Sequence, residues 1–328
     1  RALRSLFFVG GRLLRASGLA ALGARTLPSA GVLRSARFGL AMLAATAAWR
    51  VPDARSSRGV TAPVGDDARR GTGRRVAVLT GCVQEGLYGR VNQSTIRTLE
   101  ANGFEVVKVK GQDCCGALHA HGGDLDRARA LAKTNVEAFL ASGVDLVVVN
   151  AAGCGAAMKE YGTLLGSGGD DHARARDLAS RVRDVTEVLA EVGPRRGAPV
   201  ECSVGYDHPC HLLHAQRVSR PPLQVLEAIP GVEVRVIANA DECCGGAGIY
   251  GITHPDLGGR IGADKVAAVR AVGADAVATP NPGCMMQIGA GLLMDGAREG
   301  VVHPVELLDE SYRRAGYYGE PSTKRSPG

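Results

Sequence analysis

One arrangement of cysteines occurs twice in the chain, and this repeat limits the possible folds more than any other feature. Each copy has a single cysteine, then a Cys-Cys-Gly, then a second single cysteine, and matching landmarks lie 128 to 130 residues apart. The matches are Gly81-Cys82 with Pro209-Cys210, Asp113-Cys114-Cys115-Gly116 with Glu242-Cys243-Cys244-Gly245, and Gly153-Cys154 with Gly283-Cys284. Landmarks that keep one order with so little drift indicate two copies of one unit, over about residues 75–165 and 200–298.

Strand-like and helix-like segments alternate from residue 75 onward. Short β-rich runs lie at 75–80, 104–110, 146–150, 203–207, 232–238 and 274–279, and longer helical stretches lie at 124–141, 172–192, 257–272 and 304–314. Strands joined by crossover helices pair in parallel. The sequence therefore predicts an α/β fold of two tandem, pseudo-repeated units, each with a small parallel sheet.

The same pattern predicts three regions. Residues 1–74 form a basic helical and linker segment, whose Gly-, Ser-, Pro- and Arg-rich part covers 52–75. Residues 75–198 form a first cysteine-rich domain with a bridging helix. Residues 199–328 form a second one with a C-terminal helix and a tail after Gly319.

The cysteines follow the predicted strands. Loops that leave the carboxyl ends of parallel strands converge on one edge of a sheet, so we expect the four thiols of each copy to meet there. This predicts two sites with one set of candidate cofactor and metal ligands each, Cys82, Cys114, Cys115 and Cys154 in the first copy and Cys210, Cys243, Cys244 and Cys284 in the second.

Four thiolates at one place favour a soft metal centre, either an iron–sulfur cluster or Zn²⁺. Structural zinc usually takes its ligands from Cys-x2-4-Cys knuckles, which are absent from the sequence, so we favour clusters. Vicinal cysteines rarely bridge each other without strain, which argues against disulfides. Cys202 has no counterpart in the repeat, and we interpret it as a buried strand residue.

Histidines flank both Cys-Cys-Gly and single-cysteine motifs. They can donate hydrogen bonds to cluster sulfurs or deliver protons, or they can be ordinary loop residues, and the sequence leaves both interpretations open. The candidates are His119 and His121 in the first copy, and His208, His211 and His214 in the second. Met285 and Met286 are interpreted as helix core rather than ligands, and no other catalytic motif is found.

The net charge of +6 belongs to the N-terminal segment. Residues 1–80 hold fourteen arginines, no lysine and three aspartates, so the rest of the chain is slightly acidic. Leu3, Leu6, Phe7, Leu13 and Leu14, interleaved with arginines, fit an amphipathic helix on a membrane surface, on a partner, or on its own domain. A transit peptide is a weaker alternative. Aromatic residues make up 4% of the chain, too few for a stacking platform, so nucleic acid is not an expected partner.

Five stretches around these motifs resemble a known family. They are 113–121, 208–216, 243–250, 281–288 and 303–308. With the duplicated cysteines they resemble the cysteine-rich domain, named for its Cys-Cys-Gly motif, of heterodisulfide reductase subunits, lactate-utilisation proteins and, most of all, the glycolate oxidase iron–sulfur subunit. The likeness covers about residues 75–315.

This resemblance implies the iron–sulfur electron-transfer subunit of a glycolate dehydrogenase-like oxidoreductase. A partner flavin subunit would oxidise a 2-hydroxy acid, glycolate or lactate, and the clusters would pass electrons toward a quinone or another acceptor at a membrane surface. No catalytic residue for the hydroxy acid is expected in this chain. We expect a cytoplasmic protein, with peripheral attachment to the inner face of the membrane as the open alternative.

The sequence departs from the family pattern in two ways. Family members of this length class begin with two ferredoxin motifs, which this chain lacks, and it starts at Arg1, so we expect a truncated N-terminus. The heterodisulfide reductase pattern has a fifth cysteine per site, where this chain has Ala151 and Asn281. Four thiolates per site favour one [4Fe–4S] cluster in each repeat. A catalytic heterodisulfide or thiol reductase is the runner-up, and a structural zinc module is the third hypothesis.

Overall fold

The structure is a computed structural model that describes residues 2–28, 31, 33–52, 71, 73–248 and 250–319. Most of the linker expected at 52–75 and the tail after Gly319 lie outside the described residues.

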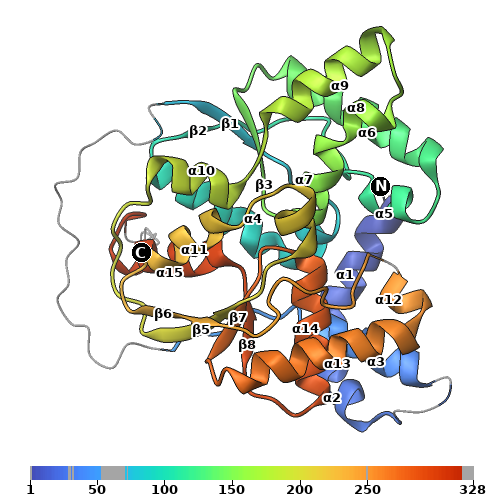
Figure 1. The fold of residues 1–328 in the computed structure, drawn as a ribbon, viewed down its shortest axis with the longest axis vertical. Helices are drawn as coiled ribbons and strands as arrows, with labels where there is room; N and C mark the ends of the chain where they lie inside the picture. The colour runs from blue at the N-terminus through green and yellow to red at the C-terminus, as the bar shows by residue number, and fades with distance from the viewer. Residues whose placement is uncertain are drawn as a thin grey trace, which may run out of the picture.

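Two four-stranded parallel sheets form the centre of the molecule, one in each repeat (Figure 1). Their strand orders, β2-β1-β3-β4 and β6-β5-β7-β8, are the same, and every pairing is parallel. The strands are β1 (Arg75–Val78), β2 (Glu105–Val106), β3 (Leu146–Val149), β4 (Val182–Asp184), β5 (Cys202–Tyr206), β6 (Val232–Val236), β7 (Ala276–Ala278) and β8 (Gly300–Val302). The predicted α/β class with two parallel-sheet repeats is confirmed.

Helices connect these strands and cover the sheets. In the N-terminal segment and first repeat they are α1 (Ala2–Ala16), α2 (Leu19–Thr26), α3 (Leu33–Ala44), α4 (Val83–Ala101), α5 (Ala117–His121), α6 (Leu125–Ala141), α7 (Ala152–Lys159), α8 (Tyr161–Leu164), α9 (Gly169–Arg181) and α10 (Val185–Val192). In the second repeat they are a π-helical turn (His211–Ala215), α11 (Arg220–Glu227), α12 (Tyr250–Thr253), α13 (Pro255–Ala271), α14 (Pro282–Met294) and α15 (Pro304–Arg314).

The fourth strand of each sheet is the main difference from the sequence prediction. The single helix expected at 172–192 is wrong, because β4 interrupts it and Asp184 begins a new helix, α10. Asp184 accepts from the backbone of Thr186, and Glu187 reaches back to the backbone of Asp184, which is a capping box. The strand expected at 104–110 is also wrong in length, since only Glu105 and Val106 pair with β1.

The C-terminal helix joins the two repeats. Side chains of α15 contact α4 of the first repeat: Asp309 accepts hydrogen bonds of 2.9 Å from both Ser94 and Arg97, and Glu306 pairs with Arg90 at 2.6 Å. The largest apolar core runs through both sheets, from Val76 and Val148 to Val204 and Leu308. The two repeats therefore pack as one body, while the domain boundaries at 75–198 and 199–328 remain a prediction.

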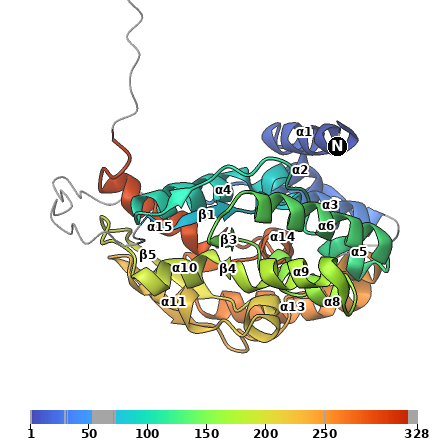
Figure 2. The ribbon, with the colours of Figure 1, turned by 90° about the horizontal axis from the view of Figure 1, so that it is seen from above.

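The N-terminal helices lie against this body, with α1 outermost (Figure 2). On α1, Arg15 donates to the carbonyls of Thr46 and Leu87 at 2.9 and 3.2 Å, while Leu6, Phe7 and Leu13 are exposed. The predicted amphipathic helix thus packs on its own chain and also presents apolar side chains outward. Among the described residues no single helix is long and apolar enough to cross a membrane, although the pair Leu6–Ala16 and Leu19–Thr26, bent by 72°, meets that test of length and composition together.

A buried ion pair fastens α13 to the second sheet. Lys265 lies 3.0 Å from Asp207, and both side chains are almost fully buried, at 2% and 1% exposure. The ammonium also donates to the carbonyls of Asn239 and Ala240, in the turn that leads to Cys243. Thr279 donates to Asp207 at 2.9 Å, so the carboxylate is held from two elements.

We expect Lys265→Met to destabilise the protein by roughly 3–5 kcal/mol, because it leaves Asp207 charged or protonated in the core without its partner. Lys133→Met is the matched control, since Lys133 pairs with Asp171 at the surface, where such pairs contribute about 0–1 kcal/mol. Urea unfolding of both variants measures the difference. Equal losses would show that the buried pair has no special role.

Candidate metal centres

The four cysteines of the first repeat come together at the carboxyl ends of β1, β2 and β3. Cys82 precedes α4, Cys114 and Cys115 precede α5, and Cys154 lies in the first turn of α7. The Sγ atoms of Cys82 and Cys114 are 3.2 Å apart, and the Cys115 thiol is hydrogen-bonded to both Cys114 and Cys154. The structure thus brings all four predicted residues into one group.

The second repeat has the same arrangement. Cys210 precedes the π-helical turn, Cys243 and Cys244 follow β6, and Cys284 lies in the first turn of α14. The Sγ atoms of Cys244 and Cys284 are 3.2 Å apart, and the Cys243 thiol is hydrogen-bonded to Cys210 and Cys244. Cys202, by contrast, is a buried residue of β5 with a free thiol, as expected.

Contacts between the thiols change their acidity. Hydrogen bonds from Cys115 and Cys82 lower the pKa of Cys114 to about 3, and hydrogen bonds from Cys210 and Cys244 lower the pKa of Cys243 to about 2. Each group therefore contains one thiol that ionises readily, and the thiolate is the form that binds metals. Burial raises the pKa of Cys202 to about 11, in keeping with a packing role.

The surroundings of the second group fit a cluster that needs hydrogen bonds to sulfur. The backbone N–H of Gly245 donates to the Sγ of Cys243 at 3.3 Å, and the side-chain amide of Asn281 donates to the Sγ of Cys284 at 3.2 Å. Four soft sulfur donors with N–H groups directed at them are the setting of iron–sulfur ligation. In the part of the chain that the structure describes, no three His, Cys, Asp or Glu side chains are placed so that they could hold a metal ion.

Two buried residues that the sequence analysis missed hold the first Cys-Cys loop. Asn135 of α6 accepts from the N–H of Asp113 and donates to the carbonyl of Cys114, both at 2.9 Å. Tyr161 donates to the carbonyl of Cys115 at 2.8 Å. Asn135 is the one polar residue on the buried face of α6, and a polar side chain in an apolar helical stripe was the signal for it.

The five predicted histidines have different surroundings. His211 lies beside the thiol of Cys210, with Nδ1 3.7 Å from Sγ, and its ring stacks on His121 of the first repeat at 5.6 Å. His119 pairs with Asp124 at 3.1 Å, and His214 binds the carbonyl of Asp241 at 3.2 Å, both at the surface. His208 packs edge-on against Tyr206, and burial lowers its pKa.

A sixth histidine, not among those candidates, is fully buried between the repeats. His303 Nε2 lies 3.1 Å from the carbonyl oxygen of Asn150, and Nδ1 accepts from the N–H of Val305. Because Nδ1 accepts, Nε2 carries the proton and donates. Burial lowers the pKa of His303 to about 3, so the ring is neutral.

The two thiol groups adjoin each other across the interface of the repeats. The amide of Asn281, which donates to Cys284, also accepts from the N–H of Gly153 at 3.3 Å, next to Cys154. The N–H of Ala152 donates to the carbonyl of Pro280 at 3.1 Å. A short path of covalent and hydrogen bonds, through Gly153 and Asn281, therefore connects Cys154 of the first group to Cys284 of the second.

Comparison with known proteins identifies this architecture. The family model for the cysteine-rich domain, CCG, matches residues 76–159 and 204–289. The chain belongs to the CCG cysteine-rich domain family. Both matched segments contain a complete set of four cysteines and cover, from within the first strand onward, the first three strands of their repeat.

Relatives within this family include iron–sulfur proteins of several oxidoreductases. The chain is 36% identical over 247 residues to the "Probable glycolate oxidase iron-sulfur subunit" of Bacillus subtilis (strain 168), which covers 74% of this chain and 55% of that protein. It is 32% identical over 242 residues to a subunit of the fumarate reductase (CoM/CoB) of Methanothermobacter marburgensis, covering 73% of this chain and 47% of that protein. It is 28% identical over 236 residues to "Lactate utilization protein A" of Shouchella clausii, covering 71% and 98%.

The chain thus spans about half the length of the first two relatives. These similarities support an oxidoreductase role and the presence of iron–sulfur clusters.

Gly245 offers a test of the second group. Its φ is +83°, and a Cβ there would lie 2.4 Å from the carbonyl oxygen of Gly258 and 2.9 Å from the nitrogen of Gly262. We expect Gly245→Ala to displace the Cys243–Cys244 loop and to lose the iron of the second site. Gly273→Ala is the matched control, with a φ of +62° and no atom within 4 Å of its Cβ.

The control adds only backbone strain, of roughly 1–2 kcal/mol. Iron analysis after anaerobic purification, together with thermal unfolding, separates the two effects. Full iron content in Gly245→Ala would contradict the assignment of this loop to a metal centre.

Proposed function

We propose that the protein is the electron-transfer subunit of a dehydrogenase complex that oxidises a 2-hydroxy acid, glycolate or lactate. A partner flavin subunit carries out the oxidation, and this chain relays electrons toward a quinone or another acceptor. The observation that carries the proposal is the pair of four-cysteine groups that adjoin through Asn281 and Gly153. The named relatives, a glycolate oxidase subunit and a lactate utilisation protein, support the substrate class.

In this proposal each cysteine group holds one [4Fe–4S] cluster. Cys82, Cys114, Cys115 and Cys154 are the ligands of the first, and Cys210, Cys243, Cys244 and Cys284 are those of the second. The bound clusters supply reversible one-electron transfer. The protein's own contribution is to keep the thiolates out of water, since Cys114, Cys115, Cys244 and Cys284 are buried, and to direct N–H donors at the sulfurs.

Hydrogen bonds to sulfur raise the reduction potential of a cluster, because they stabilise its more negative reduced state. The two cysteine groups differ in a side-chain hydrogen bond to sulfur. Asn281 donates to Cys284 in the second group, and the matching position in the first repeat is Ala151, which has no side-chain donor. The difference favours electron flow from the first site to the second.

The runner-up, a heterodisulfide or thiol reductase, rests on the similarity to the CoM/CoB fumarate reductase subunit. In such an enzyme the cluster itself attacks the substrate. The replacement of the extra cysteine by Ala151 and Asn281 argues against it. Disulfide turnover by the iron-replete protein without a flavin partner would favour this alternative.

Cys202, the ninth cysteine, provides a matched control for replacing one of the proposed ligand cysteines. We expect Cys210→Ser to lose the iron, sulfide and EPR signal of one site, because a ligand of the second group is removed. Cys202→Ser should keep all three, because Cys202 lies in β5 outside both groups. Anaerobic purification with metal analysis and EPR makes the comparison, and a colourless protein that holds zinc would overturn the proposed function.

We also propose that the N-terminal helices attach the protein to the inner face of a membrane. Seven of the twelve large apolar side chains that are exposed in the described structure lie within residues 6–33. All the charged residues of the first fifty are arginines. Apolar side chains surrounded by arginines suit the surface of an anionic bilayer, which binds both.

Phe7 and Val236 provide a matched pair for this attachment. Phe7 is 74% exposed on α1, and Val236 is 91% exposed on β6. Since burying such a side chain in the interface contributes about 1.5–3 kcal/mol, we expect Phe7→Glu to weaken binding to phosphatidylglycerol vesicles by about tenfold or more. Val236→Glu should leave it unchanged. Vesicle co-sedimentation is the measurement, and equal binding of both variants would contradict a membrane role for α1.

A further inference from the structure

A cavity lies beside the Cys243–Cys244 group and is not part of it. It has a volume of about 780 Å³ and opens between α3, α13 and α14. Its walls are mainly apolar, with Phe38 and Met42 from α3, Val266 from α13 and Met294 from α14. This volume is in the range of sites for small molecules.

One buried polar side chain lies where the cavity meets the thiol group. Gln287, 5% exposed, lines the cavity on α14 one helical turn after Cys284. A Cβ at Gly262, another lining residue, would lie 2.9 Å from the Nε2 of Gln287 and 3.5 Å from the carbonyl oxygen of Cys244. A single layer of residues therefore separates the cavity from the second thiol group.

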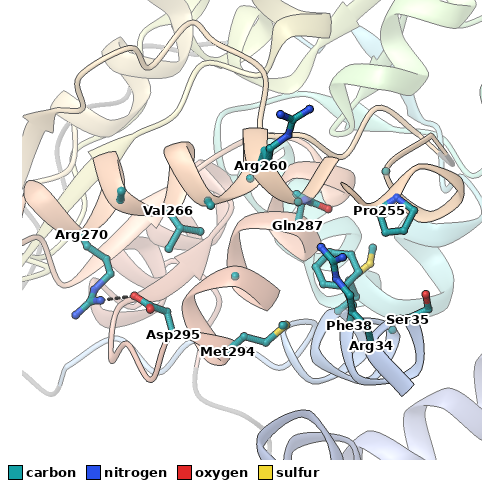
Figure 3. Close-up of a pocket in the computed structure, with 18 residues that line it drawn as sticks. Arg34, Ser35, Phe38, Pro255, Arg260, Val266, Arg270, Gln287, Met294 and Asp295 are labelled. Carbon is teal, nitrogen blue, oxygen red and sulfur yellow. Dashed lines mark hydrogen bonds and ion pairs between the residues drawn. The ribbon is translucent and has the colours of Figure 1, made fainter. Parts of the chain in front are cut away.

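The mouth of the cavity, unlike this inner end, is flanked by charged side chains that form ion pairs. Arg34 pairs with Asp256, and Arg270 pairs with Asp295 at the far side. Figure 3 shows the Arg270–Asp295 pair at one edge and Arg260 pointing away from the other labelled side chains. Since α3 belongs to the segment that exposes apolar side chains, a molecule from a membrane would meet this opening next to that segment.

We propose that this cavity binds a lipophilic quinone, with its head toward Gln287 and its tail along Phe38, Met42 and Met294. The inference rests on the proposed function, because the quinone is then the acceptor of electrons from the second site. The reaction balances as a 2-hydroxy acid plus a quinone giving a 2-oxo acid plus a quinol. Two electrons and two protons leave the acid, and the same numbers reduce the quinone. The amide of Gln287 offers a hydrogen bond to a quinone oxygen, and the apolar walls suit an isoprenoid tail.

Gly39 allows a direct test, because it lines the cavity on α3 and a Cβ there would meet no atom within 4 Å. A leucine at this position fills the cavity and also favours the helix. Gly10→Leu on α1 is the matched control, since its Cβ is equally free and Gly10 does not line the cavity. Ser35→Phe, at the same mouth, is a second filling variant in case Gly39→Leu does not fold.

The probe is decylubiquinone, titrated by calorimetry into anaerobically purified protein whose iron content has been measured. We expect binding to the wild type and to Gly10→Leu, and binding weaker by about tenfold or more in Gly39→Leu and Ser35→Phe. An azido derivative of the same quinone should label peptides of α3, α13 or α14.

Three results would overturn the cavity assignment. The first is that the quinone does not bind to iron-replete protein, and the second is that it binds equally to all variants. The third is that palmitate, which has a tail but no quinone head, displaces the quinone and binds with the same affinity. Each of these leaves the electron-transfer function standing. Absence of iron would instead refute the proposed function, whatever the calorimetry shows.

Discussion

Parallel pairing of each central strand with two neighbours is the constraint on which the sites depend. β1 pairs in parallel with β2 and β3, and β5 pairs in parallel with β6 and β7. The three strands that precede the cysteines in each repeat then end at one edge, so cysteines more than thirty residues apart in sequence reach the same place. An antiparallel neighbour would send one of those loops to the opposite edge, and the group of four would not form.

The packing of the repeats adds a second constraint, which a single repeat could not supply. His303 of the second repeat donates to the carbonyl of Asn150, which directly precedes the loop to Cys154. Asn281 and Gly153 join the two cysteine loops themselves. The His303 contact is buried and polar, so breaking it would leave unsatisfied groups in the interior. The contacts that hold the repeats together therefore also hold the two cysteine loops beside each other.

The repeat and the cysteine spacing sufficed to predict the α/β class and the parallel sheets, and the structure brings the cysteines of each predicted set together. The fourth strands could not be predicted in the same way. Val182 and Val301 belong to three-residue strands that are too short to show a period of two, and the first is fused in sequence to the helical pattern of α9. The Asp184 and Glu187 capping box was the available signal for the break. Contacts of Asn135, Tyr161 and Asn281 depend on tertiary packing between distant segments, which no local pattern encodes.

The two repeats have the same sheet topology and the same cysteine pattern, yet the residues around their cysteine groups differ. In the proposed relay this difference sets the direction of electron transfer. Among the described residues, the cavity lined by Gln287 lies beside the second group only, and α3 packs on α14 through Ala41 and Ala290. The hydrogen bond from Asn281 to sulfur also belongs to the second group alone. In a relay whose last carrier needs the higher potential and the access to an acceptor, both features belong at the exit. In the proposed relay the first group, bordered by α5 and α6, is the entrance, and the proposed flavin partner would bind on that side of the molecule.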